Sequence, residues 1–146
     1  LGDVYKRQLA DYAQGENKNS FKFFDFGSLD IEIVEIGDDF IVGRMPVIEK
    51  TKQPYGILHG GASCVLAESV GSTAAALTLD GSKKYPVGIE INANHISSPK
   101  HGDVFAKAMP LHIGGSTSVW NIDISDDHAK RVCFVRFTAL HKTYPK

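Results

Sequence analysis

The residues with the clearest chemical potential lie in one stretch, QPYGILHGGASCVLAESVGSTAA, which spans residues 53–75. His59 and a glycine pair, Gly60 and Gly61, precede a run of small residues in which Glu68 is the only charged side chain. The first N–H groups of a helix lack internal partners and lie at its positive end, and glycines let a ligand approach them. Such a helix start could polarise a carbonyl oxygen, while a nearby carboxylate attacks the carbon or activates water. The stretch therefore points to hydrolysis of an activated acyl group.

Both features also fit a purely structural interpretation. Glycine pairs serve many junctions between a loop and a helix, and most helical glutamates face solvent. The alanine, glycine and serine neighbours of Glu68 favour a functional site over a solvated helix face.

Composition and motif content exclude several classes of function. The 146 residues carry a net charge of -1, so no basic excess indicates a nucleic-acid or anionic-membrane partner. The chain has no apolar run of transmembrane length, no GxSxG, no P-loop and no GxGxxG. Its histidines show no recognised metal spacing, so we expect neither a metal nor a cofactor. Cys64 and Cys133 form no CxxC pair and predict two small buried thiols in a reduced, cytoplasmic protein.

An α+β arrangement must position the chemical groups. Alternating side chains predict a hairpin from residues 29–36 and 40–47, and helical spacing predicts a helix over residues 60–79 with Gly81 as its C-cap. Four strands follow as a meander, and the whole sheet should wrap around the helix. Apolar residues should share one face within each of three strands: Val87, Ile89, Ile91 and Ala93; Trp120, Ile122 and Ile124; and Cys133, Val135, Phe137 and Ala139.

The predicted helix has two apolar faces. The face of larger residues should lie on the sheet, and it consists of Leu66, Val70, Thr73 and Leu77. The face of small residues should let a second chain approach closely, and it consists of Ala67, Gly71, Ala74 and Ala75. Glu68 and Ser72 lie four residues apart, so they are neighbours on the helix surface.

Three segments together carry a family resemblance: TKQPYGILHGGASCVLAESVGS, VGIEINANHISS and PLHIGGSTSVW. They resemble the hotdog-fold acyl-CoA thioesterases of the PaaI-like superfamily. The resemblance is strongest to the branch of the 1,4-dihydroxy-2-naphthoyl-CoA hydrolases and the enterobactin proofreading thioesterases. It covers most of residues 31–139 and implies an antiparallel sheet wrapped around one long central helix, which agrees with the predicted order of elements.

The resemblance implies roles for individual residues. Glu68 corresponds to the catalytic carboxylate, as nucleophile or general base, and Gly60 to the residue whose N–H binds the thioester oxygen. His59 and Gln53 correspond to residues that position the thioester or assist the leaving group. Residues implied to bind the substrate are Ser72, Gly88, His95, Ile96, Ser97, Ser98, His112, Ile113, Gly114, Gly115, Ser116, Thr117 and Arg136.

The chain departs from the family pattern where the family binds the phosphates of CoA. Relatives tend to carry arginine where this chain has Ser97, and basic or polar groups around residues 116–117. Lys100 or Arg136 would replace the lost charge, or both remain solvated surface residues. Backbone N–H groups of residues 114–115 are another way to bind phosphate.

The expected activity is hydrolysis of an aromatic or broad-range acyl-CoA, with 1,4-dihydroxy-2-naphthoyl-CoA as one candidate, to the free acid and CoA. The alternatives are a non-catalytic module that binds acyl-CoA or an acyl carrier protein, and a hydratase that uses Asp123 and His128. The family builds its site across a dimer interface, so we expect a homodimer at least and a homotetramer as the usual form.

We divide the chain into an N-terminal segment, residues 1–20, and a single hotdog thioesterase domain, residues 21–146. The opening LGDVYKRQ lacks methionine, as expected of either a fragment or a chain that carries a fusion or assembly scar, so residues 1–8 carry no functional expectation. The aromatic run FKFFDF, residues 21–26, is expected to cover an edge of the core.

Overall fold

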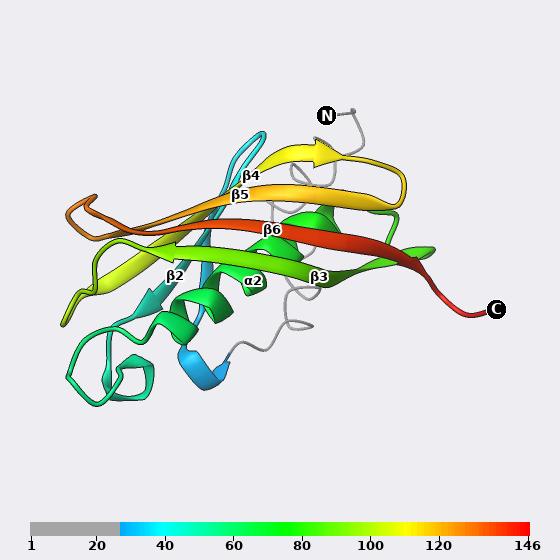
Figure 1. Cartoon of the computed structure of the whole chain (residues 1–146). Coiled ribbons are helices and arrows are strands. Elements are labelled where there is room, and N and C mark those ends of the chain that lie inside the picture. The colour runs from blue at the N-terminus through cyan, green and yellow to red at the C-terminus, as the bar shows by residue number, and fades with distance from the viewer. Residues whose placement is uncertain (1–26) are drawn as a thin grey trace.

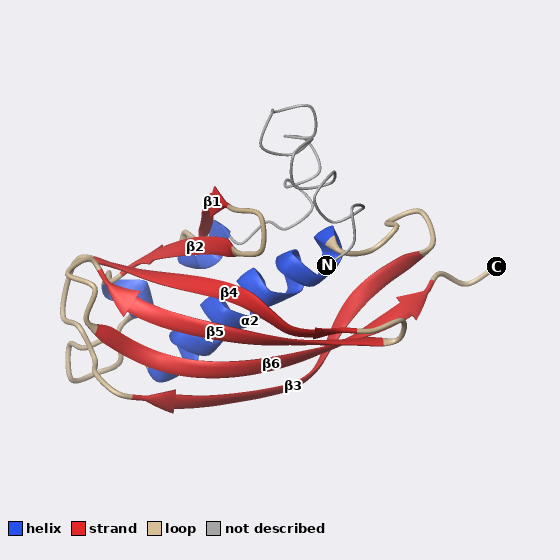
Figure 2. Ribbon diagram, turned by 90° about the horizontal axis from the view of Figure 1, so that it is seen from above, coloured by secondary structure: helices blue, strands red, loops and turns tan. Residues whose placement is uncertain are grey.

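The computed structural model describes residues 27–146, in which one long helix packs against a six-stranded antiparallel sheet. Figures 1 and 2 show the helix lying along one face of the sheet, whose strands curve around it. This arrangement confirms the predicted hotdog class. The expected N-terminal segment and the aromatic run at 21–26 lie outside the described residues. The elements are β1 (Glu32–Ile36), β2 (Ile41–Pro46), α2 (Gly60–Leu77), β3 (Lys84–His95), β4 (Asp103–Ile113), β5 (Thr117–Asp126) and β6 (Arg131–Thr143), with short 3-10 segments η2 (Gly27–Leu29) and η3 (Glu49–Thr51).

The order of strands in the sheet is β1-β2-β4-β5-β6-β3. The hairpin of β1 and β2 is confirmed, and β4, β5 and β6 form a meander. The prediction of a four-strand meander is wrong for β3, which pairs with β6 at the far edge of the sheet. Residues 96–102 carry the chain from β3 past β6 and β5 to β4, a connection too long for a tight hairpin.

The core faces of β5 and β6 agree with the predicted alternation. Every member of the two predicted sets, residues 120, 122 and 124 on β5 and residues 133, 135, 137 and 139 on β6, is buried. Trp120 and Phe137 are paired across the two strands and are the two largest fully buried side chains. The buried faces of β5 and β6 are part of the sheet surface against which α2 packs.

A β-bulge in β3 overturns the predicted face of that strand. The register shifts between Gly88 and Glu90, so one extra residue interrupts the alternation. Ile91 packs against the core, whereas Val87 and Ile89 are exposed. A strict two-residue period cannot survive an inserted residue, so the four apolar residues do not share a face.

The helix begins where the sequence predicted and ends earlier, at Leu77. Thr78 caps the C-terminus in an ordinary helical conformation, and its N–H and hydroxyl both donate to the carbonyl of Ala75. The predicted glycine cap is therefore wrong, because a 3-10-like last turn satisfies these carbonyls without Gly81. Among the described residues, no helix combines the length and apolar character needed to cross a bilayer.

The small-residue face of α2 packs on the sheet of its own chain. Its four members, Ala67, Gly71, Ala74 and Ala75, are all buried. A Cβ on Gly71 would come within 2.6 Å of the Phe137 ring and 2.9 Å of Ile122. The expectation that this face receives a second chain is therefore wrong, because the small side chains allow the sheet itself to approach. The face of α2 left open instead carries Gly61, Val65 and Glu68.

Candidate active site

The N-terminus of α2 presents one backbone N–H that is ready to bind an acceptor. His59 is the N-cap residue, and its Nδ1 accepts the N–H of Gly61 at 2.8 Å. The N–H of Gly60 has no hydrogen-bond partner within the described part of the chain. It lies at the positive end of the helix, where a carbonyl oxygen would be polarised.

The side chains of His59 and Gln53 also present donors at this end of α2. Because Nδ1 of His59 accepts a hydrogen bond, the proton of the neutral ring lies on Nε2. The amide oxygen of Gln53 accepts the N–H of Tyr55, which leaves its NH2 group as the free end. The loop therefore offers three donors: the N–H of Gly60, the Nε2–H of His59 and the NH2 group of Gln53.

Buried anchors fix the loop that carries these donors. The hydroxyl of Thr51, a residue only 1% exposed, donates to the carbonyl of Pro46 at 2.8 Å. The carbonyl of Thr51 accepts the N–H of His59 at 2.9 Å. The N–H of Leu58 donates to Pro99 at 2.9 Å, which ties this loop to the connection between β3 and β4.

His95, at the end of β3, lies against the first residue of the helix. A Cβ on Gly60 would come within 2.9 Å of Nε2 of His95, so glycine is what allows the ring to sit there. Ser97, two residues on, uses its hydroxyl to bind the carbonyl of Arg131 at 2.7 Å, and its N–H donates to Val132. His95 thus lies at the Gly60 end of α2, whereas Ser97 ties the segment after β3 to the start of β6.

Glu68 lies two turns along α2, on the open face of the helix, and is exposed in the single chain. Its carboxylate contacts the position where Gly88 would carry a Cβ, so Gly88 forms the seat of the carboxylate beside the bulge of β3. No described residue forms a hydrogen bond or an ion pair with it. Ser72, half-buried, follows one turn later. Glu68 is therefore positioned by packing and its oxygens remain free to react.

Within one chain, the N–H of Gly60 and the carboxylate of Glu68 lie apart along α2 and face different directions. Eight residues along a helix correspond to about 12 Å and a rotation of about 80°. A single thioester group cannot span that separation while contacting both. Within one chain, the structure therefore separates the predicted oxyanion donor from the predicted carboxylate.

The segment 112–117 lies at the opposite end of the sheet from the donors around Gly60 (Figure 1). Its turn is closed by the N–H of Gly114, which donates to the carbonyl of Thr117 at 2.8 Å. That bond occupies one of the two N–H groups expected to bind phosphate, because an N–H that closes a turn is not free. Gly115 and Ser116 remain exposed, and the ring of His112 lies against Gly114.

Arg136 lies on the sheet face turned away from α2. It stands in register with Asn92 on β3 and Asn121 on β5, while its neighbour Phe137 points into the core. The structure therefore does not bring Arg136 near Glu68 in the same chain. The exposed side chain of Ile96 also stands apart from Glu68, at the end of β3.

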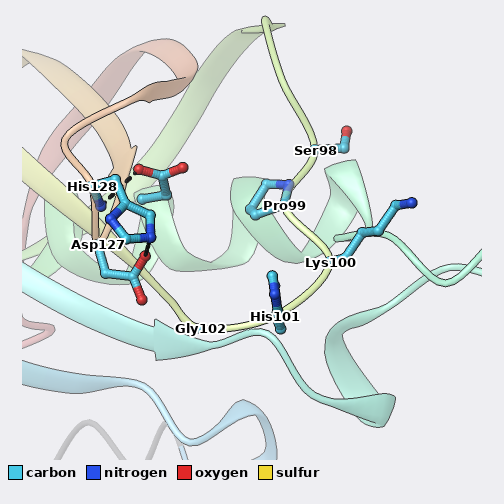
Figure 3. Close-up of a pocket in the computed structure, with 8 residues that line it drawn as sticks. Ser98, Pro99, Lys100, His101, Gly102, Asp127 and His128 are labelled. Atoms are coloured by element: carbon cyan, nitrogen blue, oxygen red, sulfur yellow. Dashed lines mark hydrogen bonds and ion pairs between the residues drawn. The ribbon is translucent and has the colours of Figure 1, made fainter.

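A cavity of about 350 Å³ opens between the β3–β4 connection and the β5–β6 turn (Figure 3). His128 pairs there with its neighbour Asp127 at 3.7 Å, and Asp123 does not line the cavity. The hydratase alternative needed Asp123 and His128 as partners, and the geometry does not provide them.

Lys100 points away from Asp127 and His128, toward solvent. The lining residues are Ser98, Pro99, Lys100, His101, Gly102, Asp126, Asp127 and His128.

The two cysteines are free thiols near the site, one half-buried and one buried. Burial raises the pKa of Cys64, and the charge of Glu68 raises it further. Burial, followed by the charge of Cys64, raises the pKa of Cys133 to about 11. Both groups are therefore protonated at neutral pH, which makes them poor nucleophiles. Within residues 27–146, no group of three or more His, Cys, Asp or Glu side chains is placed to hold a metal ion.

Comparison with known proteins places these features in context. A family model described as the thioesterase superfamily matches residues 55–133, which include the whole of α2 and its glycine pair. The chain is similar to a 1,4-dihydroxy-2-naphthoyl-CoA hydrolase of Escherichia coli strain K12, with 50% identity over 112 residues that cover 77% of this chain and 82% of the relative. It is also similar to the proofreading thioesterase EntH of Cronobacter turicensis, with 43% identity over 111 residues covering 75% and 80% of the two chains.

Solved structures show the same architecture. A thioesterase from Haemophilus influenzae superposes with a TM-score of 0.80 at 38% identity, covering 94% of this chain and 92% of that chain. A hypothetical protein from Staphylococcus aureus superposes with a TM-score of 0.79 at 42% identity, covering 81% and 98%.

Proposed function

The chain belongs to the thioesterase superfamily and is a thioester hydrolase, and we propose that its substrate is an aromatic or broad-range acyl-CoA. One geometrical observation carries the proposal. Among residues 27–146, the carboxylate of Glu68 on α2 has no partner and rests on Gly88, and the N–H of Gly60 at the start of the same helix is free. Water and acyl-CoA would give the free acid and CoA. The relatives named for 1,4-dihydroxy-2-naphthoyl-CoA support that compound as the first candidate.

The separation within one chain supports a site made by two copies. The carboxylate of Glu68 and the N–H of Gly60 lie about two helical turns apart, whereas one carbonyl group must contact both. In the proposed homodimer, Gly60 of one copy and Glu68 of the other face the same thioester. A homotetramer of two such dimers is the form we propose for the protein in solution.

The unpaired edge of β3 supports the same assembly. β3 is twelve residues long, lies at the edge of the sheet, and pairs only with β6 among the strands of residues 27–146. A long free edge tends to recruit another strand. Pairing of two β3 edges would bring the open faces of two α2 helices, and so two Glu68 side chains, to one interface.

The proposed reaction begins when the N–H of Gly60 binds the thioester oxygen. Glu68 then attacks the carbonyl carbon, giving an anhydride that water cleaves, or it takes a proton from a water molecule that attacks directly. In either route the carbon–sulfur bond breaks and the thiolate of CoA leaves. The Nε2–H of His59 is a source of a proton for the sulfur on this loop. The reaction as proposed needs no cofactor beyond the CoA of its substrate, and the two free thiols fit a cytoplasmic setting.

A substrate panel tests the proposal. Release of the CoA thiol from 1,4-dihydroxy-2-naphthoyl-CoA, benzoyl-CoA and linear acyl-CoAs gives kcat/KM for each, and we expect the aromatic substrates to rank first. Replacing Glu68 with alanine should lower kcat by about 10²–10⁴-fold while the fold is retained. Saturable binding of acyl-CoA without thiol release would instead support the non-catalytic module.

A further inference from the structure

The end of the sheet farthest from Gly60 contains a buried polar chain of three side chains. The indole N–H of Trp120 donates to the hydroxyl of Ser118 at 2.9 Å, and the same oxygen lies 2.9 Å from Nε2 of His141. Ser118 and Trp120 are fully buried, and His141 is 6% exposed. Such groups are costly inside an apolar core unless their hydrogen bonds are made, so their arrangement needs a physical reason.

Trp120 and His141 share the hydroxyl of Ser118. The indole of Trp120 can only donate, so it occupies one lone pair of the Ser118 oxygen, and Nε2 of His141 either accepts the hydroxyl proton or donates to the second lone pair, according to the tautomer of the ring. Nδ1 of His141 is buried and forms no geometrically complete hydrogen bond among residues 27–146, but the carbonyls of Gly115 and Gly114 act on the ring from the turn. Burial lowers the pKa of His141, the carbonyl of Gly115 opposes that shift, and the charge of Lys84 lowers the pKa further. The ring is therefore neutral at physiological pH and lies directly behind the turn between β4 and β5.

Residues of β6 and β3 donate hydrogen bonds to the carbonyls of the turn between β4 and β5. The N–H of His141 on β6 donates to the carbonyl of Ser116 at 2.8 Å. Nζ of Lys84, the first residue of β3, donates to the carbonyl of Gly115 at 2.7 Å. Figure 1 shows the turn beside the start of β3 and the end of β6. The backbone of the turn is thus fixed by residues distant in sequence.

The outer side of the same turn is open to solvent and suited to an anion. Gly115 and Ser116 are exposed, and a Cβ on Gly115 would meet nothing within 4 Å. The N–H of Gly115 has no partner in the described structure, and the hydroxyl of Ser116 and the ammonium of Lys84 lie at the same turn. An exposed N–H beside a cation and a hydroxyl matches the chemistry of a phosphate group.

We propose that His141 is a positioning residue: its ring and backbone, with Ser118 and Lys84, set the Gly115–Ser116 turn in the shape that binds a phosphate of CoA. This inference rests on the proposed function, because it assigns the turn to the nucleotide half of the substrate. His141 itself does not touch the substrate, since it is buried behind the turn. Its effect should therefore appear in binding of CoA and not in the chemical step.

A matched pair of variants tests the role of the ring. His141→Gln keeps a polar group near the position of Nε2, whereas His141→Asn is too short to reach Ser118. We expect His141→Asn to raise KM for acyl-CoA about tenfold, the scale of one or two lost hydrogen bonds, with kcat nearly unchanged. His141→Gln should restore most of that loss. Lys84→Met should raise KM in the same way, and His128→Gln, at the opposite end of the sheet, should leave both constants unchanged.

A truncated substrate separates this role from general damage. The acyl-pantetheine thioester lacks the nucleotide and its phosphates, so its KM should be the same in wild type and His141→Asn. Equal KM values for the two His141 variants on acyl-CoA, or an equal rise on the truncated substrate, would overturn the proposal.

A binding measurement in the wild-type protein keeps the inference testable if the variants do not fold or the protein proves inactive. Trp120 is the only tryptophan of the chain, so its indole proton gives a single resonance. Titration with CoA alone should shift that resonance through Ser118 and His141, whereas pantetheine should not. An inactive wild-type enzyme that still shows this shift would refute the proposed hydrolysis and retain the inference; no shift on CoA binding would refute the inference alone.

Discussion

The carboxylate of Glu68 on α2 rests against the α-carbon of Gly88 on β3, at the bulge where the register of β3 and β6 changes. No side chain could occupy position 88 without displacing the carboxylate. The bulge and the glycine therefore act together to position Glu68, a carboxylate without a hydrogen-bond or ion-pair partner in the described part of the chain.

Replacement of Gly88 with alanine should displace Glu68 and lower kcat by about 10²-fold or more, because a misplaced group loses most of its catalytic effect. Circular dichroism should show that the fold is kept, and steady-state kinetics on an acyl-CoA measure the loss. Gly81→Ala is the matched control, since a Cβ there would meet nothing within 4 Å. Wild-type kcat in Gly88→Ala would show that the seat is unnecessary.

Gly60→Ala should be coupled to His95. A Cβ at position 60 would lie 2.9 Å from Nε2 of His95, so alanine should be tolerated better when residue 95 is also alanine. We expect a coupling energy of about 1 kcal/mol in a double-mutant cycle of chemical denaturation. Additive effects of the two substitutions would mean that the ring moves aside without cost.

Two inactive variants should restore activity when they share a dimer. Glu68→Ala and His59→Ala each destroy every site in a homodimer, but a hybrid of the two contains one intact site if the halves come from different chains. Refolding an equal mixture should return about a quarter of the wild-type rate, because about half the dimers are hybrids with one working site of two. A mixture as inactive as its components would place both residues in a site within one chain.

The buried thiol of Cys133 should make stability fall at alkaline pH. Burial raises its pKa from 9.0 to about 11, so folding favours the protonated thiol. The resulting stabilisation is complete below about pH 9 and is lost between about pH 9 and 11, at most about 2–3 kcal/mol in the free energy of unfolding. Urea unfolding of wild type and Cys133→Ala across this range measures the difference. A constant difference between the two proteins from pH 8 to 11 would argue against the shift.

The sequence was sufficient where local pattern and local structure coincide. Trp120, Ile122 and Ile124 lie on a regular strand, so their alternation identified a core face directly. The start of α2 at Gly60 also followed from the glycine pair and the apolar run after it. The fold class, the helix and the placement of Glu68 on it were within reach of the sequence.

Features that depend on distant segments were not predictable in this way. The bulge that exposes Val87 and the pairing of β3 with β6 arise from contacts between strands, which leave no local signature. The contact of His95 with Gly60 joins residues 35 positions apart, and only the folded chain reveals it. His141 did carry a signal, because it continues the buried alternation of β6 as the only basic member of that face.

The two ends of β3 touch two different parts of the proposed site. Lys84, at its first residue, holds the turn of Gly115, and His95, at its last, lies against Gly60. Twelve residues of strand span about 36 Å, so β3 fixes the interval between the Gly115 turn and Gly60. Deleting two residues from its middle would preserve the alternation of faces and shorten that interval by about 7 Å. Within one chain, the length of this edge strand, and not the identity of any side chain, thus sets the distance between the turn at Gly115 and the helix start at Gly60.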